Sequence, residues 1–469
     1  MSNHKLQIFI GVLFCVNVLS QDKITLNHAD SLIGKVENGE QIREAIGNVS
    51  LVHNNVSINC NRVVQYFNQN KAELFGNVKV VKDTVTILAP VGTYYGNEAK
   101  VICPTGATLI DPSNTLKANY GIYFFNQDLA NFRGNVRITD NKSYTITSDE
   151  LDYYRSIDKS FGRGNVTIKT DSSTITSDNL VYERRIGYSV ANGNVKIESD
   201  STIVTADKGT YYEREKKSIG EGNVKIIFLA DNATFFGDYS ENFERTNYSF
   251  IRGNAELIQI EQKNNVPDTL FIYSTSMESF RNIPEHYIAK DSVKIIRSDY
   301  SSSSGIAFYN RNEFGKGGNI NLSKDPVVWK SDMQISGDSI YGFFKDNLED
   351  IYVYKSAFAL QNKDEKKYDQ MSGVFMHLNF LNDEIKKVRV DTNANSVYFV
   401  FEDSKLSGAN KSKGEIIEIF FKDKEVVKVK IINSPEGTYY PKKLMSDSEL
   451  TLPGFRIRND KPVRKQRFN

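Results

Sequence analysis

The chain has 469 residues, which is enough for two or three domains. Its 59 Lys and Arg residues balance 58 Asp and Glu residues, so the whole-chain charge of +1 does not favour nucleic acid as a partner. Hydrophobic residues make up 39% and aromatic residues 12%, with a single Trp and 10 Pro, which is more typical of a β-rich protein with polar outer faces than of a compact α/β enzyme.

Residues 1–20 read as an export signal. Lys5 supplies the positive start, residues 6–19 the apolar stretch, and residues 18–20 a small-residue cleavage site before Gln21. The apolar stretch is short for a membrane span, and no later segment approaches 18 apolar residues. We therefore expect an exported protein. The residues leave open whether the signal is cleaved or kept as an anchor.

A Gly-Asn-Val triplet recurs along the following part of the chain. Gly164 and Gly193 are 29 residues apart, as are Gly193 and Gly222. Such regular spacing predicts stacked units, each too small to bury a core alone. The copies, including degenerate ones at the third and last positions, begin at Gly47, Gly76, Gly106, Gly134, Gly164, Gly193, Gly222 and Gly253.

Each repeat contains two segments with the apolar and polar alternation of a β-strand. Val195-Lys196-Ile197 follows one Gly-Asn pair, and residues 175–182 carry the second pattern, Ile-Thr-Ser-Asp-x-Leu-x-Tyr. We expect Gly-Asn to form a turn and the two strands to build two facing sheets. The apolar positions would then form an inward seam, which is the predicted lipid-binding set: Val136, Ile138, Leu151, Tyr153, Val166, Ile168, Leu180, Tyr182, Val195, Ile197, Tyr211, Val224 and Ile226.

The predicted organisation after the signal has four parts. Residues 21–257 form the repeat array, and residues 258–330, with scattered Pro, Ser and Gly, form an irregular connecting region that contains strands. Residues 331–440 continue the stack with longer hairpins. Residues 441–469 form a basic tail, which is either solvated or in contact with anionic lipid headgroups or a partner.

The sequence offers no catalytic or metal-binding motif, so we expect no enzyme activity, no metal and no cofactor. The recurring Asp149, Asp178 and Asp207 follow Ser or Ala and are better explained by turn capping than by a ladder of metal ligands. A carbohydrate-active enzyme would need carboxylates gathered on one face, and the acidic residues do not repeat in that way. Cys60 and Cys103 lie at different offsets within their repeats, which does not favour a disulfide between them.

The repeat unit resembles the OstA-like repeat of the lipopolysaccharide-transport proteins LptA, LptC and the N-terminal part of LptD. The resemblance covers residues 24–256, and the second half, with Pro and Trp in residues 325–329 and Leu-Pro-Gly-Phe at 452–455, looks like long OstA-like periplasmic proteins of Bacteroidota. It implies an extended, twisted β-jellyroll (a β-taco) whose interior holds lipid A acyl chains. It also implies edge-strand docking to other Lpt-type transport proteins, or a head-to-tail homo-oligomer.

Two functions follow from different states of the interior. An open apolar seam predicts a periplasmic lipopolysaccharide carrier that forms part of a bridge to the outer membrane and shields acyl chains during transport. A closed core predicts a structural or adhesive β-solenoid at the cell surface. Periodicity alone does not distinguish an open seam from a closed one, so the function depends on the packing of the interior.

Overall fold

The computed structural model describes residues 22–140, 142–263, 266–311, 317–345, 347–364, 367–382, 384–402, 405–423 and 425–465. The predicted signal at residues 1–20 lies outside the described residues. The chain divides into two compact units, unit 1 up to Val166 and unit 2 from Thr167 onward. Each unit is considered by itself.

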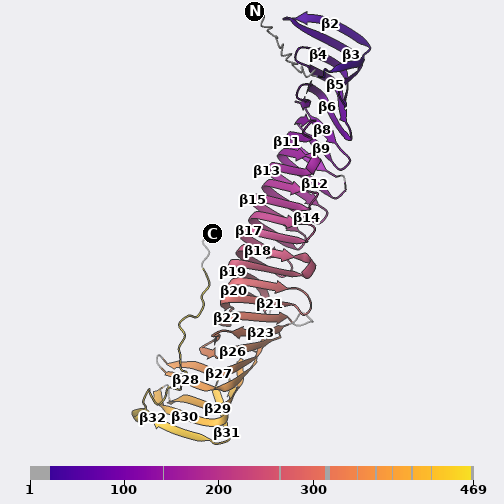
Figure 1. Ribbon diagram of the computed structural model, residues 1–469. Helices are drawn as coiled ribbons and strands as arrows, with labels where there is room; N and C mark the ends of the chain where they lie inside the picture. The colour runs from indigo at the N-terminus through magenta and orange to yellow at the C-terminus, as the bar shows by residue number, and fades with distance from the viewer. Residues whose placement is uncertain are drawn as a thin grey trace, which may run out of the picture. The chain divides into compact units, whose positions relative to one another are not determined.

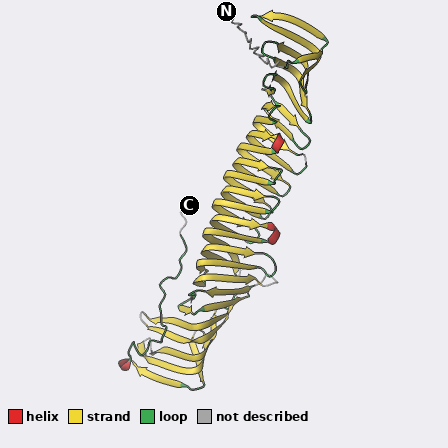
Figure 2. Cartoon of the chain, viewed as in Figure 1, coloured by secondary structure: helices red, strands yellow, loops and turns green. Residues whose placement is uncertain are grey.

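The described residues form 32 β-strands and three short 3-10 helices (Figures 1 and 2). Strands that follow one another along the chain pair in antiparallel fashion through most of each unit. The all-β class predicted from the alternating pattern is therefore confirmed.

Unit 1 is a succession of antiparallel hairpins. Its strands are β1 (Thr25–His28), β2 (Ser31–Glu37), β3 (Glu40–His53), β4 (Val56–Tyr66), β5 (Lys71–Lys82), β6 (Val85–Tyr95), β7 (Lys100–Cys103), β8 (Ala107–Ile110), β9 (Thr115–Ala118), β10 (Tyr120–Phe124), β11 (Leu129–Thr139) and β12 (Tyr144–Tyr154), followed by helix η1 (Arg155–Ile157). The boundary between the units falls within β13 (Lys159–Thr170).

Unit 2 continues with strands of similar length and then with longer hairpins. Its strands are β14 (Ser173–Glu183), β15 (Tyr188–Ser199), β16 (Thr202–Tyr212), β17 (Lys217–Phe228), β18 (Ala233–Phe243), β19 (Tyr248–Lys263), β20 (Val266–Phe280), β21 (His286–Ile296), β22 (Tyr300–Arg311), β23 (Gly318–Ser323), β24 (Val327–Lys330), β25 (Met333–Ser336), β26 (Ser339–Phe344), β27 (Leu348–Asp364), β28 (Lys367–Leu381), β29 (Glu384–Glu402), β30 (Lys405–Lys422), β31 (Glu425–Ile432) and β32 (Glu436–Pro441). Helix η2 (Glu244–Thr246) follows β18, and η3 (Lys442–Leu444) follows β32.

The Gly-Asn pairs do not reverse the chain, so this part of the prediction is wrong. Gly193 and Asn194 lie in the middle of β15, where the register with β16 shifts between Asn192 and Val195. Both residues have positive φ, 76° and 48°. This is a β-bulge, which bends a strand without ending it. Each repeat therefore adds two long, bent strands to one ladder instead of one short strand to each of two sheets.

An Asp from the neighbouring segment supports five of the Gly-Asn bulges, whereas Asn61 and Asn119 take its place beside Gly76 and Gly134. Asn194 Nδ2 donates to Asp178 Oδ2 at 3.0 Å, and Asn223 makes the same bond to Asp207. A Cβ on Gly193 would lie only 2.2 Å from Asp178 Oδ2, so the close approach requires glycine. These contacts give the recurring Asp, including Asp178 and Asp207, a structural role at the bulges where it occurs.

The interior of unit 1 is closely packed. The side chains of Tyr94, Tyr123, Phe125 and Phe132 are almost completely buried, together with many aliphatic residues. Cys60 and Cys103 are buried free thiols and form no disulfide. Burial raises the pKa of Cys60 to about 11 and that of Cys103 to about 12, which keeps both thiols protonated and unreactive at neutral pH.

Residues 258–330, where an irregular connecting region with strands is predicted, contain β20 to β24. Residues 331–440 contain the longest hairpins, β27 with β28 and β29 with β30. One hydrophobic cluster runs through unit 2 from Ala206 to Ile419. A smaller second cluster includes Phe358, Val397 and Leu452 and lies where the C-terminal segment packs on the sheet.

Candidate functional site

The thirteen predicted lipid-binding residues fall into two classes of burial. Ile168, Tyr182, Ile197, Tyr211 and Ile226 are half-buried. The other eight are almost completely buried: Val136, Ile138, Leu151, Tyr153, Val166, Leu180, Val195 and Val224. Solvent therefore reaches part of the predicted set, and the half-buried members all lie in unit 2.

Seven half-buried apolar residues of unit 2 form a continuous cross-strand row. Successive members face each other across neighbouring strands, beginning with Ile175 opposite Ile197 and Ile197 opposite Val204. We call this set the aliphatic row, and it runs over β14 to β20: Ile175, Ile197, Val204, Ile226, Phe235, Leu257 and Ile272. All seven side chains are half-buried.

The row is closed at its C-terminal end. Ile272 pairs with Ile295, which is 2% exposed, and Ile295 pairs with the buried Ser302. In unit 1, the corresponding pair, Ile138 opposite Ile146, is also buried, at 2% and 3% exposed. The same strand position is thus buried in unit 1 and only half-buried over seven strands of unit 2.

The side chains on the other side of the bulge differ between the units over part of the row, between Leu180 and Ile251. In unit 1, Phe132 faces Leu151, and both are large and buried. In unit 2, the equivalent row contains Ala191, Gly209 and Gly220, which pair in sequence across β15, β16 and β17. Small residues supply fewer atoms to cover the opposite arm of a bent strand, so the aliphatic row keeps part of its surface in contact with solvent.

A polar row accompanies the aliphatic one on the same face of the strands. Tyr182 lies two residues after Leu180 on β14, so both side chains point to the same face of the strand. Leu180 is buried in the interior. Tyr182 pairs with Ser189, which in turn pairs with Tyr211. The row continues through Ser218, Asn242, Ser249 and Ser279. The interior face of β14 to β20 is therefore amphipathic, with an aliphatic side and a hydroxyl-rich side.

The aliphatic row contains five residues that the sequence prediction missed: Ile175, Val204, Phe235, Leu257 and Ile272. Ile175 and Leu180 are five positions apart, so simple alternation places them on opposite faces. The register shift between Thr176 and Asn179 restores them to the same face. Recognition of the recurring Asp as the partner of the bulge is the signal that could have found Ile175, Val204 and Phe235, each three residues before such an Asp.

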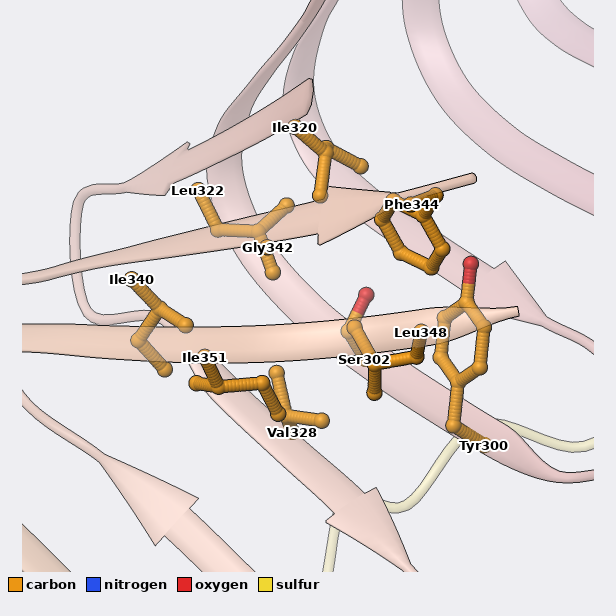
Figure 3. Close-up of a pocket in the computed structure, with 10 residues that line it drawn as sticks. All are labelled: Tyr300, Ser302, Ile320, Leu322, Val328, Ile340, Gly342, Phe344, Leu348 and Ile351. Carbon is orange, nitrogen blue, oxygen red and sulfur yellow. The ribbon is translucent and has the colours of Figure 1, made fainter. Parts of the chain in front are cut away.

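A small apolar cavity lies in the interior beyond the end of the row (Figure 3). Tyr300, Ser302, Ile320 and Phe344 are among its lining residues. Its volume is about 20 Å³, which suits one water molecule and no acyl chain. The interior of β22 to β27 is therefore packed, and the aliphatic row remains the candidate for binding an extended apolar ligand.

Two further observations concern the described residues alone. They contain no helix long and apolar enough to cross a membrane. They also contain no group of three or more His, Cys, Asp or Glu residues placed to hold a metal ion.

Each unit has a strand edge that carries exposed apolar residues. In unit 1, β2 is exposed along its whole length, pairs with β3 and presents Leu32 and Val36. In unit 2, β31 pairs with β30 and presents Val427 and Val429, which are more than half exposed. Such edges can pair with a further strand from another chain.

These features define an all-β protein of tandem bent hairpins with a partly exposed apolar interior face. Residues 21–104 match the family described as OstA-like protein, so the chain carries an OstA-like domain there. The match covers less than half of the chain and lies within unit 1. No curated protein matches the chain.

Among solved structures, the chain is similar to LptH, described as the LptA-homologous periplasmic component of the conserved lipopolysaccharide transport device from Pseudomonas aeruginosa. The sequence identity is 13%, and the match covers 32% of this chain and 82% of LptH. The TM-score of the match is 0.18.

Proposed function

We propose that the protein is a non-enzymatic periplasmic carrier of lipopolysaccharide that shields lipid A acyl chains against the aliphatic row of unit 2. The observation that carries the proposal is the run of seven half-buried aliphatic and aromatic side chains in register across β14 to β20. The OstA-like domain at residues 21–104 and the export pattern of residues 1–20 support the same function.

The dimensions of the row fit fatty-acid chains. Seven residues on neighbouring strands span about 30 Å at about 4.8 Å per strand. That length is close to the thickness of a bilayer hydrocarbon core, which two acyl chains fill end to end. Each CH₂ group removed from water contributes about 0.8 kcal/mol, so a few chains along the row would be held by tens of methylene groups.

The neighbouring polar row suits the rest of the lipid. Hydroxyl groups of Tyr211, Ser218 and Ser249 lie on the same face, where they could hydrogen-bond sugar or ester oxygens. An acyl chain on the aliphatic side and a polar headgroup beside it would match both halves of an amphipathic ligand. The exposed edges at β2 and β31 would allow docking to other Lpt-type proteins, or to another copy, into a bridge toward the outer membrane.

The packed interior of unit 1 favours a second function. Tyr94, Tyr123 and Phe132 are buried there, and so are Ile138 and Ile146, the described residues of unit 1 that correspond to the row. If unit 2 closes in the same way in solution, the protein is a structural or adhesive solenoid. That function predicts that no lipid accompanies the purified protein.

Mass spectrometry of lipids extracted from the purified full chain distinguishes the two functions. The carrier predicts stoichiometric recovery of lipid A-containing molecules, and the recovery should fall when the row is altered. A protein that is folded but free of such lipids, and that does not bind added lipopolysaccharide, would leave the structural solenoid as the function.

A further inference from the structure

The C-terminal segment 445–465, which we call the C-terminal strap, crosses unit 2 without forming a helix or strand (Figure 1). It leaves the sheet after β32 and η3 and ends at β20, where Lys465 N donates to Tyr273 Oη at 3.2 Å. The strap therefore passes across many strands and is held at separate points.

Two buried glutamines hold the strap by its backbone. Gln370 Nε2 donates to the carbonyl of Leu450 at 2.8 Å, and Gln370 Oε1 accepts from the N–H of Leu452 at 2.9 Å. Gln334 makes the same pair of bonds to the carbonyl of Arg456 and the N–H of Arg458, both at 2.8 Å. Each glutamine side-chain amide thus binds one backbone carbonyl of the strap and the backbone N–H two residues later, as a neighbouring β-strand would.

The two glutamines belong to one cross-strand row on the outer face. Gln334 pairs with Leu360, and Leu360 pairs with Gln370. The adjacent Ile335 is completely buried and pairs with Val328 of the interior cavity, so Gln334 points away from that interior. Gln334 points outward and yet is only 8% exposed, because the strap covers it.

Side chains of the strap fill an apolar seat beside the first glutamine. Leu450 and Leu452 are each 2% exposed and join a cluster with Phe358, Leu360 and Phe399. Phe455 contacts the rings of two of the sheet's aromatic residues, Phe358 and Tyr368.

Charged groups fix the basic part. Arg458 donates to Asp325 Oδ2 at 2.8 Å and also to Asp460, and the hydrogen bond from Arg458 lowers the pKa of the Asp460 carboxyl. Near the end of the strap, the Arg464 guanidinium lies over the ring of Phe271 and the Lys465 ammonium over that of Tyr273. These contacts orient an extended, basic segment.

We propose that the outer face of unit 2 is a peptide-docking track, and that the C-terminal strap is its detachable ligand in cis. The track recognises an extended segment by two backbone clamps, a Leu-x-Leu pair and a basic residue six positions after the second Leu. The strap acts as a latch that occupies the track, and the same segment supplied in trans binds when the latch is cut.

The test uses the full chain with a protease site inserted between Leu444 and Met445, where Leu444 is 70% exposed. After cleavage, a fluorescent peptide of residues 445–465 is added at micromolar concentration and its anisotropy is measured. The cut protein should bind the peptide. The uncut protein should bind it about 100-fold more weakly, because a tethered strap competes at an effective concentration of about 1 mM.

Variants connect the binding to the clamps. Gln334→Ala with Gln370→Ala in the cut chain should weaken peptide binding at least tenfold. Gln361→Ala is the matched control, because this glutamine of β27 bonds Asp332 and does not touch the strap, so binding should not change. If the double variant does not fold by circular dichroism, a peptide with Leu450→Ser and Leu452→Ser replaces it and should also lose at least tenfold.

The proposal fails if the cut strap never exchanges with the peptide over a day, since the strap would then be a permanent part of the fold. It also fails if the double glutamine variant binds the peptide as tightly as the unaltered cut protein does. The same holds if the Leu-to-Ser peptide binds as tightly as the unaltered peptide. Lipid binding plays no part in either readout.

Discussion

Ile226 and Ile227 provide a matched pair for testing the interior face. They are neighbours on β17, of the same residue type and both half-buried. Ile226 pairs with Val204 and Phe235 in the aliphatic row, whereas Ile227 pairs with Ile203 and Thr234 on the opposite face. Ile226→Asp should abolish lipopolysaccharide binding, and Ile227→Asp should leave it unchanged.

The expected size of the effect follows from the environment of the new carboxylate. An acyl chain seated on the row would cover the charge introduced by Ile226→Asp and leave it without a hydrogen-bond partner, which costs about 3 kcal/mol or more. That cost corresponds to about a 100-fold loss of affinity. The two substitutions remove similar amounts of apolar burial, about 1 kcal/mol each, so their stabilities should be similar.

The assay is the dissociation constant for fluorescent lipopolysaccharide, with thermal unfolding of both variants as the control for folding. Equal loss of binding in both variants would show that instability, and not the interior face, governs the effect. Unchanged binding in a folded Ile226→Asp variant would refute the placement of acyl chains on the aliphatic row.

Three other predictions concern stability. Phe132→Ala should cost about 4 kcal/mol in urea unfolding while lipid recovery per folded molecule stays constant, because this ring fills the closed interior of unit 1. Gly193→Ala should cost about 1–3 kcal/mol, and added Asp178→Ala should restore part of it, since the new Cβ would meet that carboxylate. Burial raises the pKa of Asp369 to about 6, so its ionisation opposes folding as pH rises from about 4 through 6. Asp369→Asn should therefore raise the free energy of urea unfolding relative to the unaltered protein at pH 8, by up to about 3 kcal/mol, and give no such gain at pH 4. A gain of equal size at both pH values would contradict the titration of Asp369.

The repeat period and the alternation around Val195 and Ile197 were enough to predict an all-β stack. They were not enough to predict the path of the chain, because Gly-Asn suits both a turn and a bulge, and only the pairing of β15 with β16 distinguishes them. The bulge also reverses the parity of alternation, which explains why Ile175 and Val204 were missed as interior residues.

The sequence pattern also could not predict how closely the interior is packed. Ile138 and Ile197 occupy comparable apolar positions in the repeats, yet Ile138 is buried and Ile197 only half-buried. The difference depends on which residues lie across the bend, such as Phe132 in unit 1 and Ala191 in unit 2.

The docking of the C-terminal strap could not be predicted from the sequence either. It depends on Gln334 and Gln370, whose side chains bind backbone groups 122 and 80 residues further along the chain. No local motif marks a glutamine that binds so distant a segment, and only the folded chain brings the two together.

Photo-crosslinking in cells that make lipopolysaccharide tests the central claim most directly. A photoreactive residue is placed at Ile197, Ile226 or Leu257 of the row, and at Ile227 as the outward control. The account predicts lipopolysaccharide adducts at the three row positions and none at Ile227. Adducts at all four positions, or at none of them in a folded and exported protein, would contradict a carrier that holds acyl chains along this face.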